Sequence, residues 1–181
     1  SYCITRFARG KLSSRSIEDI SDEFKEFVES GVREILLTAQ DTACYGMDGG
    51  IKLPGLINEM LKIEGEYRIR VGMMNPNHLR PIAEEMMDCM NDDRVYKFLH
   101  IPVQSGSDSI LKRMRRGYTK DSFMELIDIL REHHPEISIA TDIISSFPGE
   151  TDEDHLATMD LIRELKADTL NITRFSARPG T

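Results

Sequence analysis

The sequence has no tryptophan, only three cysteines, and no apolar run long enough to span a membrane. Cys3, Cys44 and Cys89 are odd in number and irregularly spaced, which argues against the disulfide framework of a small secreted protein. The sequence also shows no secretory signal pattern. Together these absences predict a cytoplasmic protein with no membrane partner.

Positive charge is scarce as well, since the formal net charge is -8 at pH 7. Contacts to phosphates need clustered Lys and Arg, so we do not expect this chain alone to provide a nucleic-acid surface. The 181 residues, 40% of them hydrophobic, can bury one substantial core. No low-complexity linker interrupts them, and we therefore expect a single domain.

Apolar periodicity alternates between strand and helix spacing along the whole chain. Predicted strands cover Glu34–Thr38, Arg68–Gly72, Phe98–Val103, Ser138–Ile144 and Thr169–Phe175. Helical stripes lie between them, with caps expected at Ser16, Thr119 and Thr151 and one continuous helix over Leu79–Met90. Strand starts about 30 or more residues apart are typical of βα units, which predicts parallel strands joined by helices.

Polar residues within the predicted strands decide between two α/β architectures. A sheet covered by helices on both faces has nearly unbroken apolar strands, but here His100 and Gln104 share one face of their strand. Asp142, Asn171 and Thr173 interrupt two later strands in the same way. A curved, incomplete TIM-type βα barrel has an open inner face for such residues, and its chemistry gathers at the carboxyl ends of the strands. We therefore predict a partial barrel of parallel strands.

Several long motifs resemble the radical S-adenosylmethionine (SAM) core of the methylthiotransferases. They are SYCITRFARG, HIPVQSGSDSIL, MRRGYT, TDII followed by FPGET, and RFSARPGT, and the resemblance covers essentially the whole chain. TAQDTACYG and GMMNPN are most similar to the archaeal and eukaryotic branch, which converts threonylcarbamoyladenosine in tRNA to its 2-methylthio form. Branches that modify isopentenyladenosine in tRNA or a ribosomal-protein aspartate share this core, so other substrates remain alternatives.

The resemblance implies two kinds of cofactor. In the family, three cysteines spaced CxxxCxxC hold a 4Fe–4S cluster, and SAM binds to the open iron. Electron transfer then cleaves SAM to a 5'-deoxyadenosyl radical, which abstracts hydrogen from an unreactive C–H bond. The full-length enzymes carry two clusters. The implied partners are tRNA, an electron donor and a sulfur source.

The same resemblance assigns roles to individual residues. Cys3 matches the last cluster cysteine. The residues that match cofactor-binding positions are Tyr2, Gln40, Asn75, Gln104, Ser105, Arg116, Ile144 and Phe147. Of these, Arg116 is expected to hold the methionine carboxylate, and Ile144 with Phe147 to pack on adenine. His100 and Asp142 are expected to line the interior near the substrate as catalytic residues, with a buried structural hydrogen bond as the alternative.

The chain departs from the family pattern at three points. It starts inside the cluster motif, so the first two cluster cysteines and the strand before them are missing. Ser145 and Ser146 stand where the family commonly has glycine. We also expect the N-terminal cluster domain and the C-terminal RNA-binding domain to be absent. Residues 1–181 are therefore interpreted as a catalytic core fragment, inactive alone.

Two readings from other classes stay open. His100 and Asp142 suit a divalent metal in a non-radical barrel enzyme, and a scaffold module would need no chemistry at all. Cys89 is expected to be a buried small hydrophobe, and Cys44 an incidental thiol in a loop. Neither has metal-ligand spacing to Cys3.

Overall fold

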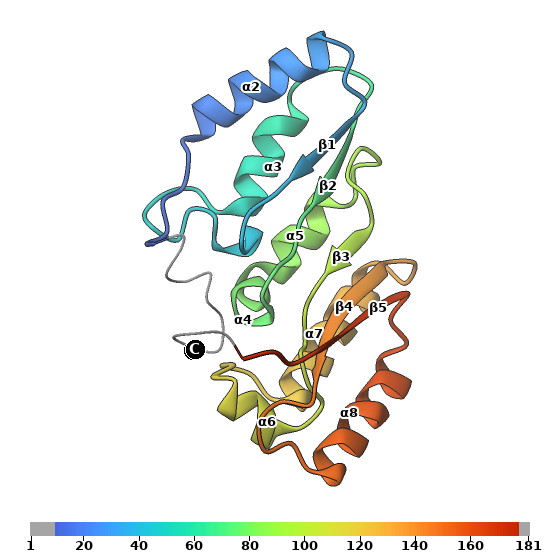
Figure 1. The fold of residues 1–181 in the computed structure, drawn as a ribbon. Helices are drawn as coiled ribbons and strands as arrows, with labels where there is room; N and C mark the ends of the chain where they lie inside the picture. Colours follow the sequence, from blue (N-terminus) through green and yellow to red (C-terminus); the bar gives the residue numbers. More distant parts are fainter. Residues whose placement is uncertain (1–9, 178–181) are drawn as a thin grey trace.

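The computed structural model, described here for residues 10–177, alternates strands with helices as the sequence pattern predicts (Figure 1). The strands of the described part are β1 (Glu34–Leu37), β2 (Arg68–Val71), β3 (Phe98–His100), β4 (Ser138–Ser145) and β5 (Thr169–Arg174). The α-helices there are α2 (Ile17–Glu29), α3 (Leu53–Leu61), α4 (Pro76–Leu79), α5 (Ala83–Cys89), α6 (Asp108–Arg113), α7 (Lys120–His133) and α8 (Asp152–Leu165). Two 3-10 helices are η1 (Thr42–Cys44) and η2 (Arg80–Ile82).

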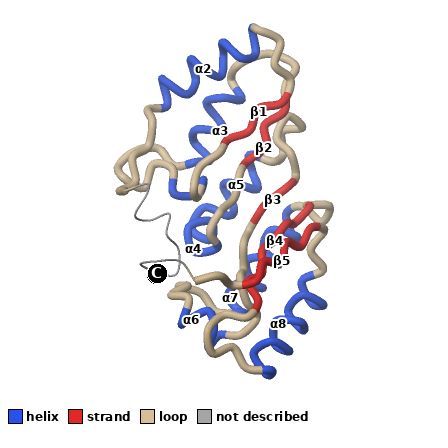
Figure 2. Tube along the Cα trace, viewed as in Figure 1, coloured by secondary structure: helices blue, strands red, loops and turns tan. Residues whose placement is uncertain are grey.

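All the described strand pairs are parallel and follow chain order (Figure 2). β1 pairs with β2, and β3, β4 and β5 form a second sheet. Backbone hydrogen bonds join the two sheets, since the Ile69 N–H donates to Arg94 at 2.7 Å and the Met74 N–H donates to His100 at 2.9 Å. The described residues thus form an open partial barrel and not a closed one, which confirms the predicted fold class.

The two faces of this partial barrel differ sharply in burial. Helices cover the outer face, where Ile69, Leu99 and Ile139 are fully buried in one continuous core. On the inner face, Leu36 is 53% exposed and Asn171 is exposed. The burial of one face alone leaves the other available for ligands, as the polar strand residues predicted.

Helix caps fix where the outer helices begin. The Thr119 and Thr151 hydroxyls accept the N–H of Ser122 and Asp154, and both caps are complete capping boxes. Ser16 caps α2 by accepting the Asp19 N–H. The longest described helices, α7 and α8, have 14 residues each, and no described helix is both long and apolar enough to cross a membrane.

Two predicted elements are shorter than expected. The strand predicted over Phe98–Val103 ends at His100, because Pro102 lacks an N–H donor and Gln104 takes a left-handed backbone conformation with φ of 76°. The helix predicted over Leu79–Met90 is broken into α4, η2 and α5 around Pro81. Both breaks lie where proline removes a backbone hydrogen bond. After the break at His100 the chain turns toward the rim of the barrel.

Candidate functional site

Three adjacent strands place a hydrogen-bonded polar cluster on the inner face. His100 on β3 lies 2.9 Å from Asp142 on β4, measured from Nε2 to Oδ1. The Asn171 amide on β5 donates to the same carboxylate oxygen at 2.9 Å. Asp142 and Asn171 are register partners, so the parallel pairing itself brings their side chains together. The two predicted catalytic residues therefore meet, and Asn171 completes their cluster.

The environment of Asp142 favours its charged form. Burial by itself raises the pKa of this carboxyl, but the hydrogen bonds from His100 and Asn171, with the charge of Arg116, lower the pKa below its ordinary value. The influence of Arg116 places this predicted carboxylate-binding residue near the same interior. The inner face thus carries a carboxylate whose charged form is favoured, hydrogen-bonded to the His100 imidazole.

The His100–Asp142–Asn171 cluster gives little support to the alternative that His100 and Asp142 bind a divalent metal. Within residues 10–177, no third His, Cys, Asp or Glu lies close enough to join His100 and Asp142 as a metal ligand. The third partner is the amide of Asn171, which donates its hydrogen to Asp142. An amide N–H cannot ligate a cation, so the cluster as it stands offers two candidate ligands, His100 and Asp142.

Gln104 forms the tip of the strand segment that the sequence predicted to face the cofactor. Its backbone N–H donates to Asp142 O at 2.8 Å, and its carbonyl accepts the Ile144 N–H at 2.9 Å. A positive φ is costly for a non-glycine residue and commonly marks a functional site. The residue is buried, and its backbone bonds to β4 place it next to Asp142.

Ser105, also predicted to bind the cofactor, points elsewhere. Its hydroxyl is fully buried and lies 3.2 Å from the Thr158 hydroxyl on α8. The next residue, Gly106, packs so closely on α8 that an added Cβ would lie 2.5 Å from the Ala157 carbonyl oxygen. These contacts fix the rim loop to α8, and direct cofactor contact by Ser105 stays a prediction that its side-chain position does not favour.

Asn75 and Gln40 follow β2 and β1 at the same rim. The Asn75 side chain caps α4 by accepting the Asn77 N–H at 3.0 Å. Gln40 is exposed in the loop after β1. Both stand at the carboxyl ends of strands, where barrel enzymes bind ligands, although Asn75 already uses its side-chain oxygen locally.

Ile144 and Phe147 belong to a small apolar cluster below the rim. Phe147 is 9% exposed and meets Phe175 edge to face, with ring centroids 5.1 Å apart. Ile110 and Met114 of the α6 region complete the cluster with Ile144. The predicted adenine contact remains untested, but the Phe147 ring is largely covered by protein and Ile144 is the more accessible of the pair.

A cleft of about 230 Å³ lies on the inner face, between β3 and the carboxyl-terminal parts of β1 and β2. Leu36, Arg70, Phe98 and His100 line it, and the Arg70 guanidinium lies 4.4 Å from the centre of the Phe98 ring. This cation–π contact holds a positive charge over an apolar floor. The cleft therefore extends the His100–Asp142–Asn171 cluster with one cationic and several apolar surfaces.

The described cysteines are poor candidates for an iron–sulfur cluster. Tyr2 and Cys3 lie outside the described residues, so their predicted roles are not placed. Cys89 is 3% exposed and burial raises its pKa to about 11. Burial, with the neighbouring Asp41 charge, raises the pKa of Cys44 to about 12. Cys44 and Cys89 are the cysteines among the described residues, fewer than the three that the cluster motif requires, so the described residues do not by themselves fit the cluster.

Sequence reasoning missed the role of Asn171 in this site. The sequence placed Asn171 on the inner face with His100 and Asp142 but assigned it no part in the site. Its pairing with Asp142 depends on the β4–β5 register, which a sequence pattern does not specify. The available signal was that both residues are polar interruptions of otherwise apolar strands that follow one another in the chain.

Comparison with known proteins assigns the fold and sequence to one family. Residues 1–162 match the family described as the radical SAM superfamily. The chain is 48% identical over 180 residues to the "Probable threonylcarbamoyladenosine tRNA methylthiotransferase" of Pyrococcus abyssi, covering 99% of this chain and 42% of that protein. The human threonylcarbamoyladenosine tRNA methylthiotransferase is 46% identical over 181 residues, covering 99% of this chain and 31% of the human one. The chain thus spans less than half the length of these relatives.

Solved structures agree on the architecture. Coproporphyrinogen III oxidase from Escherichia coli, described as a radical SAM enzyme, superposes with a TM-score of 0.64 at 16% identity and covers 93% of this chain and 40% of its own. SuiB from Streptococcus suis, solved with S-adenosylmethionine, has a TM-score of 0.61 at 12% identity, with 95% and 36% coverage. At these identities the likeness concerns the fold alone.

Proposed function

The chain belongs to the radical SAM superfamily, and we propose that it is the catalytic core of a tRNA methylthiotransferase that converts threonylcarbamoyladenosine to its 2-methylthio form. One observation carries the proposal: identity of 46–48% extends over nearly the whole chain to archaeal and human proteins of that name. The matched region covers 99% of this chain in both comparisons, so it includes the whole of the described barrel. The runner-up substrates are isopentenyladenosine in tRNA and a ribosomal-protein aspartate.

SAM is the cofactor that this function requires, and when reduced it supplies the radical that activates the substrate C–H bond. The structure offers a rim suited to it. Gln104, Asn75 and Gln40 place amide groups at the carboxyl ends of three strands, and Arg116 supplies a positive charge for the methionine carboxylate. Ile144 provides an apolar edge for adenine.

The cluster that reduces SAM needs thiolates that residues 10–177 do not supply. Cys3 stays our prediction for one of them, with Tyr2 beside the adenine. The proposal therefore derives no step from cluster geometry. It rests on what the inner face does: it binds, orients and shields the substrate.

His100, Asp142 and Asn171 are assigned to the substrate. The ionised Asp142 holds the imidazole by a 2.9 Å hydrogen bond, which fixes the ring orientation. An oriented imidazole on the wall of a barrel can bind the substrate base and take up or release a proton. The cleft beyond, with Arg70 and Phe98, gives room for the modified side of the base.

The partners follow from the proposed reaction. tRNA is the substrate, an electron donor reduces the cluster, and a sulfur source supplies the thiol that becomes methylated. The net charge of -8 leaves most of the tRNA affinity to other surfaces. Such a protein would work in the cytoplasm.

The test measures the tRNA product directly. The protein at its natural length, expressed in cells whose tRNA contains threonylcarbamoyladenosine but not its 2-methylthio form, should add the methylthio nucleoside to digests analysed by mass spectrometry. Asp142→Asn removes the charge that orients the His100 imidazole, and it should lower the yield by about 100-fold, the low end for loss of proton transfer. Asp128→Asn, at an exposed position of α7, is the control and should leave the yield unchanged.

Two results would contradict the proposal. Methylthio groups found only on isopentenyladenosine or on protein aspartate would move the substrate assignment to another branch. An Asp142→Asn protein as active as the control would remove the inner-face cluster from the mechanism.

A further inference from the structure

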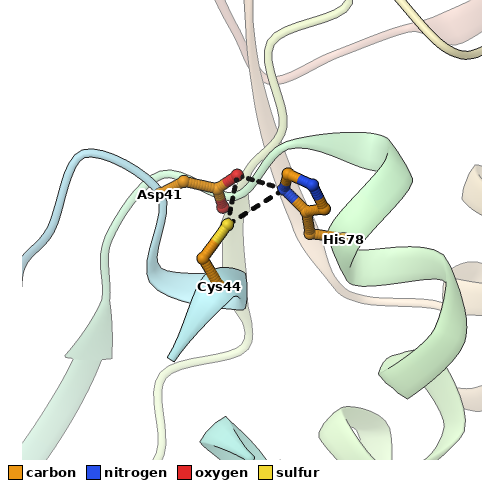
Figure 3. A group of neighbouring side chains, drawn as sticks. All are labelled: Asp41, Cys44 and His78. Carbon is orange, nitrogen blue, oxygen red and sulfur yellow. Dashed lines mark hydrogen bonds and ion pairs between the residues drawn. The ribbon is translucent and has the colours of Figure 1, made fainter. Parts of the chain in front are cut away.

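A second polar cluster lies at the rim, outside the inner-face site (Figure 3). Asp41, in the loop after β1, lies 2.6 Å from the His78 ring, measured from Oδ2 to Nδ1. The Cys44 sulfur lies 3.1 Å from the same ring nitrogen and 3.4 Å from the same carboxylate oxygen. Three chemically different donor atoms thus converge on one small space, from η1, the loop before it, and α4.

Backbone contacts hold this cluster in place. The other carboxylate oxygen of Asp41 accepts the N–H groups of Ala43 at 3.2 Å and Asn75 at 3.1 Å. This leaves Oδ2 aimed at Cys44 and His78. Thr42 fastens the two loops together, since its N–H donates to the Met73 carbonyl at 2.9 Å. These hydrogen bonds therefore hold the donor atoms in position before any ion binds, as the groups that hydrogen-bond to metal ligands do in known metal sites.

The donor set is that of a transition-metal site. Thiolate, imidazole and carboxylate together favour zinc and the ions that replace it, and not magnesium or calcium, which prefer oxygen alone. Three protein ligands with a fourth position open to water is a common zinc arrangement. Ordinary zinc bond lengths place tetrahedral donors about 3.3–3.6 Å apart, so the observed 2.6, 3.1 and 3.4 Å need to open by less than about 1 Å.

We propose that Asp41, Cys44 and His78 bind one zinc-type ion through Oδ2, Sγ and Nδ1. Among the described residues, no other group of three His, Cys, Asp or Glu side chains converges in this way. Asp41 and Cys44 are partly buried, and the His78 side chain is 36% exposed, so an ion can enter from solvent. On binding, the ion replaces the thiol proton, which leaves to solvent, and the imidazole proton moves to Nε2.

The ion would tie the loop after β1 to α4. These segments also carry Gln40 and Asn75, which the proposed function assigns to the cofactor. The site is thus a structural clamp under part of the rim, in addition to any iron–sulfur cluster. It exists or fails independently of the methylthiotransferase assignment, since its own ligands alone determine it.

Cobalt provides the test because its thiolate complexes absorb light where zinc complexes do not. The protein is prepared without iron and titrated with Co²⁺, and then with Zn²⁺ to displace it. We expect a thiolate-to-cobalt charge-transfer band with the d–d pattern of four-coordination, both lost on adding Zn²⁺. Cys44→Ser should abolish this band, and His78→Ala should weaken cobalt binding by more than about 100-fold, beyond the effect of losing a second-shell partner.

Cys89→Ser is the matched control, because that thiol is buried and donates to the Pro54 carbonyl at 3.5 Å. Cys89→Ser should leave the cobalt band intact. Cobalt bound at any other site contributes equally to the spectra of all the variants, so the difference between spectra reports this site alone. Thermal unfolding without metal checks that each variant folds, and Zn²⁺ should raise the unfolding temperature of the wild type and Cys89→Ser but not of Cys44→Ser. A cobalt spectrum identical in wild type and Cys44→Ser would show that the cluster is only a hydrogen-bonded pair with a neighbouring thiol, and would overturn the proposal.

Discussion

Several hydrogen bonds join the loop after Gln104 to α8, and the buried ones centre on the Thr158 hydroxyl. Thr158 is 3% exposed, and its Oγ1 accepts the Gly106 N–H at 3.0 Å and lies 3.2 Å from the Ser105 hydroxyl. The same hydroxyl donates to the Asp154 carbonyl at 3.1 Å, and Thr158→Val keeps the shape but removes all three bonds. A buried N–H left unpaired costs about 1–3 kcal/mol and a lost neutral hydrogen bond about 0.5–1.5 kcal/mol. The expected loss of unfolding free energy is therefore about 2–4 kcal/mol.

Urea unfolding followed by circular dichroism measures this loss, with the slope of free energy against urea checked for constancy. In a chain of this length the change corresponds to a fall in the unfolding temperature of about 4–16 °C. Thr173→Val, on the exposed inner face of β5, is the matched control and should change the free energy by less than about 0.5 kcal/mol. Equal stabilities of the two variants would refute the claim that Thr158 anchors the rim.

Three further outcomes follow from the described contacts. Leu99→Ala should lower the unfolding free energy by about 2–5 kcal/mol, because Leu99 is fully buried on the outer face. Leu36→Ala, at 53% exposure on the inner face, should lower it by less than about 0.5 kcal/mol. Similar losses in the two variants would contradict the burial of one face alone. The lowered pKa of Asp142 means that its carboxylate contributes to stability in full above its ordinary pKa near 3.8, and that this contribution is lost as pH falls through its pKa in the folded state. Asp142→Asn should therefore flatten the acid side of the plot of unfolding free energy against pH. Superimposable plots for the wild type and the variant would exclude this linkage. Tyr118→Phe should cost about 0.5–1.5 kcal/mol in urea unfolding, because the buried hydroxyl donates to the Val103 carbonyl at 3.0 Å; no change would remove that bond from the account.

Elements with strong local signals were predictable from the sequence. The strands at residues 34, 68, 98, 138 and 169 and the caps at Thr119 and Thr151 are all present. The sequence signal for each of these elements spans only a few neighbouring residues. For a strand it is the spacing of apolar residues, and for a cap it is a hydroxyl that accepts a nearby backbone N–H. The inner face was also predictable, because polar residues in a strand need a polar or open environment.

Contacts between distant segments were not predictable. Asp41 and His78 are 37 residues apart, and only the parallel pairing of β1 with β2 brings their loops together. Asn171 reaches Asp142 through strand register in the same way. The Ser105 hydroxyl meets Thr158, 53 residues away in the chain, through the packing of its loop on α8. Periodicity identifies the elements but does not fix which side chains face one another across them.

The most direct test of the central claim is whether the rim of this partial barrel binds and cleaves SAM. The protein at its natural length, reconstituted with iron and sulfide without oxygen, is mixed with SAM and a reductant, and 5'-deoxyadenosine is measured. Our account predicts its formation, with SAM binding weakened by Gln104→Ala and Arg116→Ala and unchanged by Asp128→Asn. Absence of 5'-deoxyadenosine, or rim variants that bind SAM as tightly as the wild type, would contradict it.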